Sequence, residues 1–220
     1  MDVETRCKIR KIDVVLTDDG SKTLYSEKFG EHYHSLFGAA SESNYIFIER
    51  GYLTSTFDSV SVLEIGFGTG LNALLTLQYA VKLQRPTYFE TIELYPIQEN
   101  TVNELSDDDY FRSLHNASWE EPVAITPCFA LHKRKSDLLQ TTFTRKFDVV
   151  YFDAFSPAVQ PELWSLDIFT NLFASMNHDA ILTTYCAKGE VRRAMQIAGF
   201  VVERLPGAAG KREMIRARKM

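Results

Sequence analysis

The chain has 220 residues, of which 45% are hydrophobic, and this length predicts one globular domain or one domain with an appendage. Its formal net charge of −5 hides an asymmetry: residues 188–220 carry nine Lys or Arg against three Glu, a net of +6, and residues 1–187 carry the balance of −11. The sequence contains no apolar run of membrane-spanning length and no signal-peptide pattern, so we expect no membrane association.

The three cysteines, Cys7, Cys128 and Cys186, are scattered along the chain. They form neither a metal-binding spacing nor a disulfide framework. This usage is typical of a protein in a reducing cytoplasm, and we expect no metal site.

The first part of the chain predicts a small extension. Residues 9–17 are expected to form a strand, residues 18–20 a turn, and residues 23–25 a second short strand of a hairpin. Residues 41–50 are expected to form a helix. We therefore predict that residues 1–58 are a hairpin and helix extension packed on a core domain of residues 59–220.

From residue 60 onward the pattern alternates between strand and helix. Two short strands at 200–205 and 214–218 are expected to pair with each other. The alternation predicts an α/β fold with a mostly parallel, seven-stranded sheet and helices on both faces, which binds ligands at the carboxyl ends of its strands. The other strands are expected at 60–65, 87–94, 123–129, 147–153 and 180–186, with helices at 71–83, 96–105 (opened by Pro96), 166–175 and 191–198.

A glycine-rich segment, LEIGFGTGLNALLTL at 63–77, lies where a strand passes into a helix. Gly66, Gly68 and Gly70 permit positive φ and close approach of a ligand to the backbone, and the N–H groups of the helix start favour electron-rich ligand groups. The spacing E-x-G-x-G-x-G differs from the G-x-G-x-x-G of dinucleotide-binding folds. It resembles the first motif of the Rossmann-like, class I S-adenosylmethionine-dependent methyltransferases. A nicotinamide cofactor and a purely structural turn are the alternatives.

That resemblance implies a set of cofactor contacts. Glu64, before the glycines, would help to hold the amino acid portion of S-adenosylmethionine, and Glu93, near the end of the second strand, can bond the ribose hydroxyls. Asp137, after the third strand, would bond the adenine amino group, although a helix N-cap explains this residue equally well. The candidate cofactor-binding residues are Glu64, Gly66, Phe67, Gly68, Thr69, Gly70, Asn72, Glu93 and Asp137.

The segment YFDAFSP at 151–157 ends an apolar strand in a carboxylate, Asp153, followed by Phe155 and Pro157. Amine-methylating enzymes often place an acid or amide at this position, beside the transferable methyl group. Phe155 would stack on a base or form a wall of the methyl site, and Pro157 would stiffen the loop. A strand-ending turn is the structural alternative.

The chemistry of the amine limits what Asp153 can do. An alkylammonium has a pKa near that of lysine, so its deprotonation at neutral pH costs about 4 kcal/mol. A carboxylate with an ordinary pKa of about 4 is a poor base for that proton. We therefore expect Asp153 to accept an N–H bond from the neutral amine, to aim its lone pair, and to stabilise the positive charge that develops.

Four segments together resemble the tRNA 5-methylaminomethyl-2-thiouridine methyltransferase family, the methylase half of the bifunctional MnmC enzyme. They are EHYHSLFGAASESNYIFIERG (31–51), VLEIGFGTGLNALLT (62–76), YFDAFSPAVQPELW (151–164) and GAAGKREMIRA (207–217). The resemblance implies methyl transfer from S-adenosylmethionine to the primary amine of 5-aminomethyl-2-thiouridine at the tRNA wobble position. It also implies that Asp153 is the catalytic aspartate and that Tyr33, His34 and Ser35 help to build the mouth of the site.

Two departures from that family's pattern are visible. Val159-Gln160 stands where the family often has Lys-Asn, which affects a substrate contact. The chain also shows no second glycine-rich fingerprint of the kind that a flavin-dependent oxidase domain would carry. We expect a stand-alone methylase whose aminomethyl substrate comes from an upstream enzyme.

The RNA would be bound at its exposed anticodon loop, whose bases can be splayed out and stacked on aromatic side chains. Phosphate contacts would come from the basic C-terminal segment and make binding salt-dependent, although a solvated tail explains the same charge. Arg192, Arg193 and residues 132–135 are weaker candidates. The candidate substrate-binding residues are Tyr33, His34, Ser35, Phe155, Pro157, Lys188, Lys211 and Arg212.

Two other functions fit parts of the pattern. A polyamine aminopropyltransferase shares the fold and an acid after the fourth strand, but it does not need the basic tail. A catalytically silent RNA-binding module has no use for Glu93 and Asp153 together. Fold alone does not choose between these functions.

Overall fold

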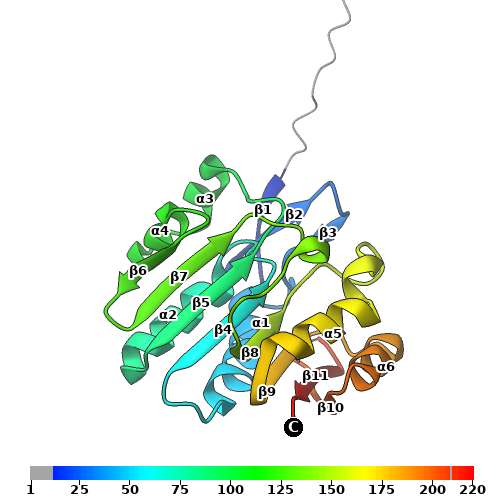
Figure 1. Ribbon diagram of the computed structural model, residues 1–220. Coiled ribbons are helices and arrows are strands. Elements are labelled where there is room, and N and C mark those ends of the chain that lie inside the picture. Colours follow the sequence, from blue (N-terminus) through cyan, green and yellow to red (C-terminus); the bar gives the residue numbers. More distant parts are fainter. Residues whose placement is uncertain (1–11, 209) are drawn as a thin grey trace, which may run out of the picture.

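The computed structural model describes residues 12–208 and 210–220 (Figure 1). Cys7 and the first three residues of the expected N-terminal strand lie outside this part of the chain. An eight-stranded sheet forms the centre, in the order β10-β11-β9-β8-β4-β5-β7-β6. Its strands are β4 (Val60–Ile65), β5 (Thr87–Ile92), β6 (Pro122–Thr126), β7 (Phe129–Arg134), β8 (Phe147–Phe152), β9 (Met176–Thr184), β10 (Val201–Pro206) and β11 (Glu213–Arg218).

The middle of the sheet is parallel. β4 pairs in parallel with β5 and β8, β5 pairs with β7, and β8 pairs with β9. All six residues of β8 are buried, because helices cover both faces of the sheet, and this burial explains why the strand is apolar except for Asp148. The edges are antiparallel: β6 pairs with β7, β11 with β9, and β10 with β11 as expected. The predicted α/β fold is confirmed.

The prediction of one strand at 123–129 is wrong. A turn at Pro127 and Cys128 divides this region into β6 and β7, which form a hairpin, and it is β7 that pairs with β5. The sheet therefore has eight strands instead of seven. The sequence FALHKR of β7 ends in three polar residues, so its continuation to Arg134 does not show as an apolar run.

Helices pack on both faces of the sheet (Figure 1). α2 (Leu71–Leu83) and α4 (Asp109–Asn116) contribute to one hydrophobic core with β4, β5 and β7, and α5 (Leu166–Ser175) and α6 (Gly189–Ile197) contribute to the other. α2 and α5 have the predicted bounds. α3 (Glu99–Leu105) begins three residues later than predicted, because Gln98, and not the turn at Pro96, is its N-cap.

α4 was not predicted. Asp108 caps it by accepting a hydrogen bond from the Phe111 backbone N–H at 2.9 Å, and only Phe111 and Leu114 are buried. The polar run SDDDYFRS therefore lacks the wide apolar stripe by which a helix is recognised in a sequence. Two 3₁₀ turns complete this half of the chain, at Leu138–Gln140 and Pro161–Trp164.

The N-terminal segment forms the expected hairpin and a third strand. β1 (Ile12–Leu16), β2 (Lys22–Ser26) and β3 (Glu31–His32) make a small antiparallel sheet. The expected helix is α1 (Ala39–Ser43), which continues as a π-helix at Asn44–Glu49, before a 3₁₀ turn at Tyr52–Thr54. Within the described residues, no helix has the length and apolar character that crossing a membrane requires.

Candidate active site

A cavity of about 680 Å³ opens at the carboxyl ends of β4, β5 and β8. The N-terminal segment, the loop between β10 and β11, and the segments that follow β7, β8 and β9 supply the rest of its wall. The predicted site residues that line this cavity are Tyr33, His34, Ser35, Gly66, Phe67, Gly68, Asn72, Glu93, Asp137, Asp153, Phe155 and Lys211. The predicted site residues outside its lining are Glu64, Thr69, Gly70, Pro157, Lys188 and Arg212.

The glycine turn between β4 and α2 needs its glycines. Gly66, Gly68 and Gly70 have φ values of +92°, +50° and +78°, a region that side chains disfavour. A Cβ on Gly66 would lie 2.9 Å from the Asp153 carbonyl oxygen, and one on Gly68 would lie 3.0 Å from the Tyr33 ring. The turn therefore packs directly against both the end of β8 and the N-terminal segment.

Glu93 fixes the glycine turn from the neighbouring strand. Its carboxylate accepts hydrogen bonds from the backbone N–H groups of Gly68 at 3.1 Å and Tyr95 at 2.7 Å. Burial raises its pKa, and these backbone donors and the Lys28 ammonium oppose that rise. A carboxylate held in this way at the cavity wall can accept bonds from vicinal hydroxyls.

Glu64 lies behind the glycine turn. It is fully buried, and neither carboxyl oxygen has a hydrogen-bond partner among the described residues. Burial raises its pKa well above the ordinary range. Because its side chain does not line the cavity, any contact with a cavity ligand must be indirect.

Two other predicted cofactor contacts have structural roles. The carbonyl oxygen of Thr69 lies 3.0 Å from Nε2 of His115, which supports the turn from α4. Asp137 caps the 3₁₀ turn at Leu138–Gln140 by accepting the Leu139 N–H at 3.0 Å. Asp137 also lines the cavity, so the capping and binding roles that the sequence left open are compatible.

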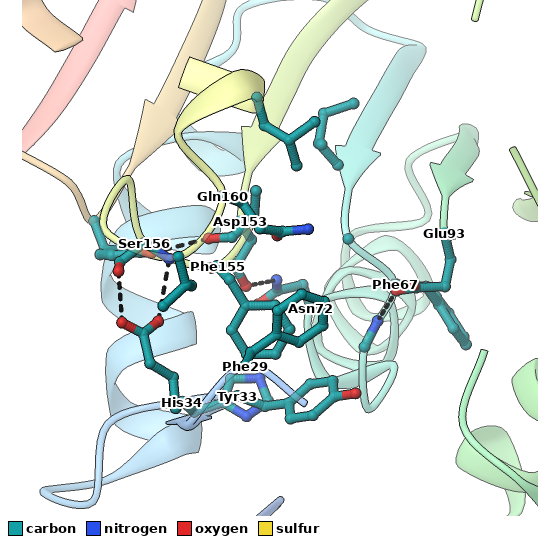
Figure 2. Close-up of a pocket in the computed structure, with 18 of the residues that line it drawn as sticks. Phe29, Tyr33, His34, Phe67, Asn72, Glu93, Asp153, Phe155, Ser156 and Gln160 are labelled. Atoms are coloured by element: carbon teal, nitrogen blue, oxygen red, sulfur yellow. Dashed lines mark hydrogen bonds between the residues drawn. The ribbon is translucent and has the colours of Figure 1, made fainter. Parts of the chain in front are cut away.

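Asp153 lies on the other side of the cavity, directly after β8. The Asn72 Nδ2 group donates a hydrogen bond to its Oδ2 atom at 2.9 Å (Figure 2). Burial raises the pKa of Asp153 to about 7, with Glu42 raising it further and Asn72 and Lys211 lowering it. The expectation of an ordinary pKa near 4 is therefore wrong, because the sequence could not show how deeply the end of β8 is enclosed.

Aromatic rings surround this carboxylate (Figure 2). The Phe155 ring centroid lies 4.4 Å from that of Phe29 and 5.0 Å from that of Tyr33, in an edge-on contact with Tyr33. Ser156 donates from its N–H and its hydroxyl to Glu31 of β3, at 3.2 and 2.5 Å. Phe155 is therefore a wall residue stacked on Phe29. The sequence pattern identified neither Phe29 nor Glu31, since both contacts join segments far apart in the chain.

The YHS segment is fixed by hydrogen bonds. The His34 backbone N–H donates to Thr23 Oγ1 at 3.1 Å, and its Nδ1 atom lies 3.1 Å from the same hydroxyl. Burial lowers the pKa of His34 to about 4, so the ring is neutral at pH 7. The Ser35 N–H donates to Glu42 at 3.1 Å. Burial also raises the pKa of the Tyr33 hydroxyl.

The predicted basic contacts separate into two groups. Lys211 points into the cavity wall, where its Nζ atom lies 2.5 Å from Glu42 and 4.3 Å from the Tyr185 ring centroid. Lys188 and Arg212 are exposed. In the segment 132–135, Lys133 is buried and donates to the His115 carbonyl oxygen, which removes it from any surface patch.

The comparisons with known proteins agree with this geometry. A family model described as S-adenosyl-L-methionine-dependent methyltransferase matches residues 130–220. The tRNA 5-methylaminomethyl-2-thiouridine biosynthesis bifunctional protein MnmC of Azoarcus sp. strain BH72 is 32% identical over 91% of this chain and 34% of its own length. The protein of the same name from Burkholderia multivorans is 29% identical over 90% and 33%. The chain thus spans about a third of the length of these curated relatives.

Two solved structures share the fold. MNMC2 from Aquifex aeolicus matches 96% of this chain and 72% of its own with a TM-score of 0.79 and 24% identity. Spermidine synthase from Thermotoga maritima matches 96% and 69% with a TM-score of 0.61 and 12% identity.

The fold and the glycine turn are similar to those of class I S-adenosyl-L-methionine-dependent methyltransferases, and residues 130–220 match the model of such a family. Within that class, the chain is similar to the MnmC-type methylase domain.

Proposed function

We propose that this protein transfers a methyl group from S-adenosylmethionine to the primary amine of 5-aminomethyl-2-thiouridine at the wobble position of tRNA. The observation that carries the proposal is the placement of Asp153 and the glycine turn in one cavity, joined by the Asn72 amide. The same cavity is lined by Glu31, Glu42 and Glu162, and such an acidic wall suits an acceptor that arrives as a cation. The names of the relatives supply the identity of the base.

The cofactor would occupy the side of the cavity formed by the glycine turn. The backbone around Gly68 permits its close approach, Glu93 would accept bonds from the ribose hydroxyls, and Asp137 would face the adenine. Glu64 would act through an intervening water on the amino acid portion. When bound there, S-adenosylmethionine supplies an electrophilic methyl group on a sulfonium.

Asp153 would act on the amine. An alkylammonium has a pKa of about 10, and the pKa of Asp153 is raised to about 7. The difference between the pKa values of the ammonium and the carboxyl group is therefore about 3. The carboxylate can then take one proton from the ammonium and leave a neutral amine with a free lone pair. The carboxyl group then passes that proton to solvent, and the carboxylate accepts one of the N–H bonds that the amine retains. This bond aims the lone pair at the methyl carbon and stabilises the charge that develops on nitrogen.

Asn72 would hold Asp153 in position. Its side chain is buried, and its Nδ2 donor occupies one carboxylate oxygen of Asp153, so the other oxygen is available to the amine. This contact supports a role for Asn72 on the acceptor side of the reaction, whereas the sequence predicted a cofactor contact.

The tRNA would approach the open side of the cavity, and Lys188 and Arg212, which are exposed, would contact it. Their charges suit the RNA backbone. Methyl transfer to a primary amine does not create that amine, so an upstream reaction must supply the aminomethyl base. We place this chemistry in the cytoplasm, consistent with the scattered cysteines.

The proposal is tested with purified protein, labelled S-adenosylmethionine and four acceptors. These are tRNA carrying the aminomethyl base, tRNA carrying the carboxymethylaminomethyl base, unmodified tRNA, and putrescine. We expect label only in the first. Labelling of putrescine alone would indicate a methyltransferase for polyamines, and release of the carboxymethyl group by the protein alone would contradict the need for an upstream enzyme.

A further inference from the structure

Two segments that lie far apart in the sequence meet at the rim of the cavity. The Glu42 carboxylate lies 2.5 Å from Lys211, and the Tyr45 hydroxyl donates to the Pro206 carbonyl oxygen at 3.1 Å. A third contact joins Phe37 to Gly210: a Cβ on Gly210 would lie only 2.6 Å from the Phe37 ring. The contacts of Glu42 and Tyr45 hold the two segments together. Neither of them explains why the aromatic ring of Phe37 lies at the surface.

Phe37 is 61% exposed, although its backbone is firmly held. Its N–H donates to Ser35 Oγ at 3.2 Å, and the carbonyl oxygen of the preceding residue, Leu36, accepts the Asp18 N–H at 2.9 Å. Gly210 has a φ of +82°, and its bare backbone supports one part of the ring. The result is a firmly held, exposed aromatic surface that none of the described residues covers.

The surroundings of Phe37 indicate what would cover it. Ser35, two residues before it, and Lys211, next to Gly210, both line the cavity, so the ring lies at the cavity's rim. Arg212, the following residue, is exposed. An exposed aromatic ring on a segment that also carries an exposed cation is a combination that suits single-stranded nucleic acid, through stacking of a base and contact with a phosphate.

We propose that Phe37, supported by Gly210 two residues before the exposed Arg212, is a stacking platform for an unpaired base of the RNA, next to the nucleotide that enters the cavity. This inference rests on the proposed RNA substrate. The platform also gives a reason for a glycine at position 210, because any side chain there would displace the Phe37 ring.

The test measures RNA binding separately from methyl transfer. An anticodon stem-loop RNA with 2-aminopurine beside the wobble position is titrated with wild-type protein and with Phe37→Ala, Phe37→Trp and Gly210→Ala variants. Leu83→Ala is the control, since Leu83 is an exposed apolar residue at the opposite end of α2 from the glycine turn. We expect wild type and Phe37→Trp to quench the fluorescence and Phe37→Ala to weaken RNA binding by about 5- to 100-fold.

Gly210→Ala is expected to reproduce the Phe37→Ala defect, whereas Leu83→Ala and the affinity of every variant for S-adenosylmethionine should match wild type. In turnover, Phe37→Ala should raise KM for tRNA and leave kcat at saturating tRNA within about twofold. Unchanged RNA affinity in Phe37→Ala, or quenching that persists without the ring, would overturn the platform. Ring-dependent RNA binding without any methyl transfer would instead retain the platform and refute the proposed function.

Discussion

The side chain of Asn72 donates a hydrogen bond to Asp153 at 2.9 Å, joining residues 81 positions apart in the sequence. Asn72 belongs to the first turn of α2, directly after the glycine turn, and Asp153 follows the last residue of β8. The elements expected to hold the cofactor and the acceptor are therefore connected through one buried polar contact. Such a contact fixes the carboxylate in one orientation and favours its charged form.

Replacing Asn72 with Ala is expected to shift the pH dependence of the reaction. The hydrogen bond lowers the pKa of Asp153, so its loss raises that pKa above the wild-type value of about 7 and reduces the ionised fraction at neutral pH. The acid limb of kcat/KM should move to higher pH, with activity reduced about tenfold at pH 7 and less at pH 9.

The pH profile distinguishes this role from a structural defect. The groups that face Asp153 are Glu42, Glu64, Tyr185 and Lys211, and all remain in the variant. Asn103→Ala, at an exposed position of α3, is the matched control and should keep the wild-type profile. A uniform loss of activity at every pH would count against the positioning role.

Asp153→Asn should abolish most turnover and at the same time stabilise the protein. The pKa of Asp153 in the folded protein, about 7, is raised above its ordinary value of 3.8, so the folded protein favours the protonated acid. Ionisation therefore costs stability as pH rises from about 4 to 7, with an upper bound of about 4 kcal/mol above pH 7. An amide cannot ionise and avoids this cost.

Thermal unfolding of wild type and Asp153→Asn without cofactor, measured from pH 4 to pH 8, shows whether the substitution stabilises the protein as pH rises. The stability advantage of Asp153→Asn should be absent near pH 4 and grow toward pH 8. A variant that was less stable than wild type at pH 8, or that kept full turnover while binding cofactor, would refute the assignment.

Gly68→Ala is expected to weaken cofactor binding, because its φ of +50° is strained for a side chain and the added Cβ would lie 3.0 Å from Tyr33. Gly20→Ala is a matched control: Gly20 has a φ of +80°, but no atom lies within 4 Å of the added Cβ. Both substitutions should cost about 1 kcal/mol of stability. Calorimetric titration with S-adenosylmethionine should show at least a tenfold loss for Gly68→Ala alone; equal affinities would place the cofactor elsewhere.

Lys211 and Arg212 are adjacent in the sequence, but we expect substitutions at the two positions to have different effects on the kinetics. Lys211 contacts Glu42 and lowers the pKa of Asp153, so Lys211→Met should reduce kcat and move the acid limb of the profile to higher pH. Arg212 is exposed, so Arg212→Ala should raise KM for tRNA, leave kcat unchanged, and reduce the slope of log affinity against log salt by about one. Identical salt slopes in both variants would contradict this separation.

Local patterns were sufficient for much of this fold. The apolar periodicity of residues 71–83 and 166–175 predicted the bounds of α2 and α5, and the alternating glycines predicted a turn with positive φ. Helix α4 and the β6–β7 hairpin were missed, because their polar residues interrupt the apolar patterns on which such predictions depend.

The location of a side chain in the cavity was predictable where it follows from a place after a strand, as for Glu93 and Asp153. It was not predictable where a role depends on tertiary contact. The bond from Ser156 to Glu31 joins residues 125 positions apart, and the raised pKa of Asp153 arises from burial by several elements. Neither the contact nor the burial can be recognised from the residues that are neighbours in the sequence.

The central claim is that the wobble amine receives the methyl group. Its most direct test is the mass of the wobble nucleoside, isolated from tRNA carrying 5-aminomethyl-2-thiouridine after incubation with the purified protein and S-adenosylmethionine. The account predicts a nucleoside heavier by a single CH₂ unit, with the added carbon on the side-chain nitrogen. An unchanged wobble nucleoside, or a methyl group on any other nucleoside, would contradict it.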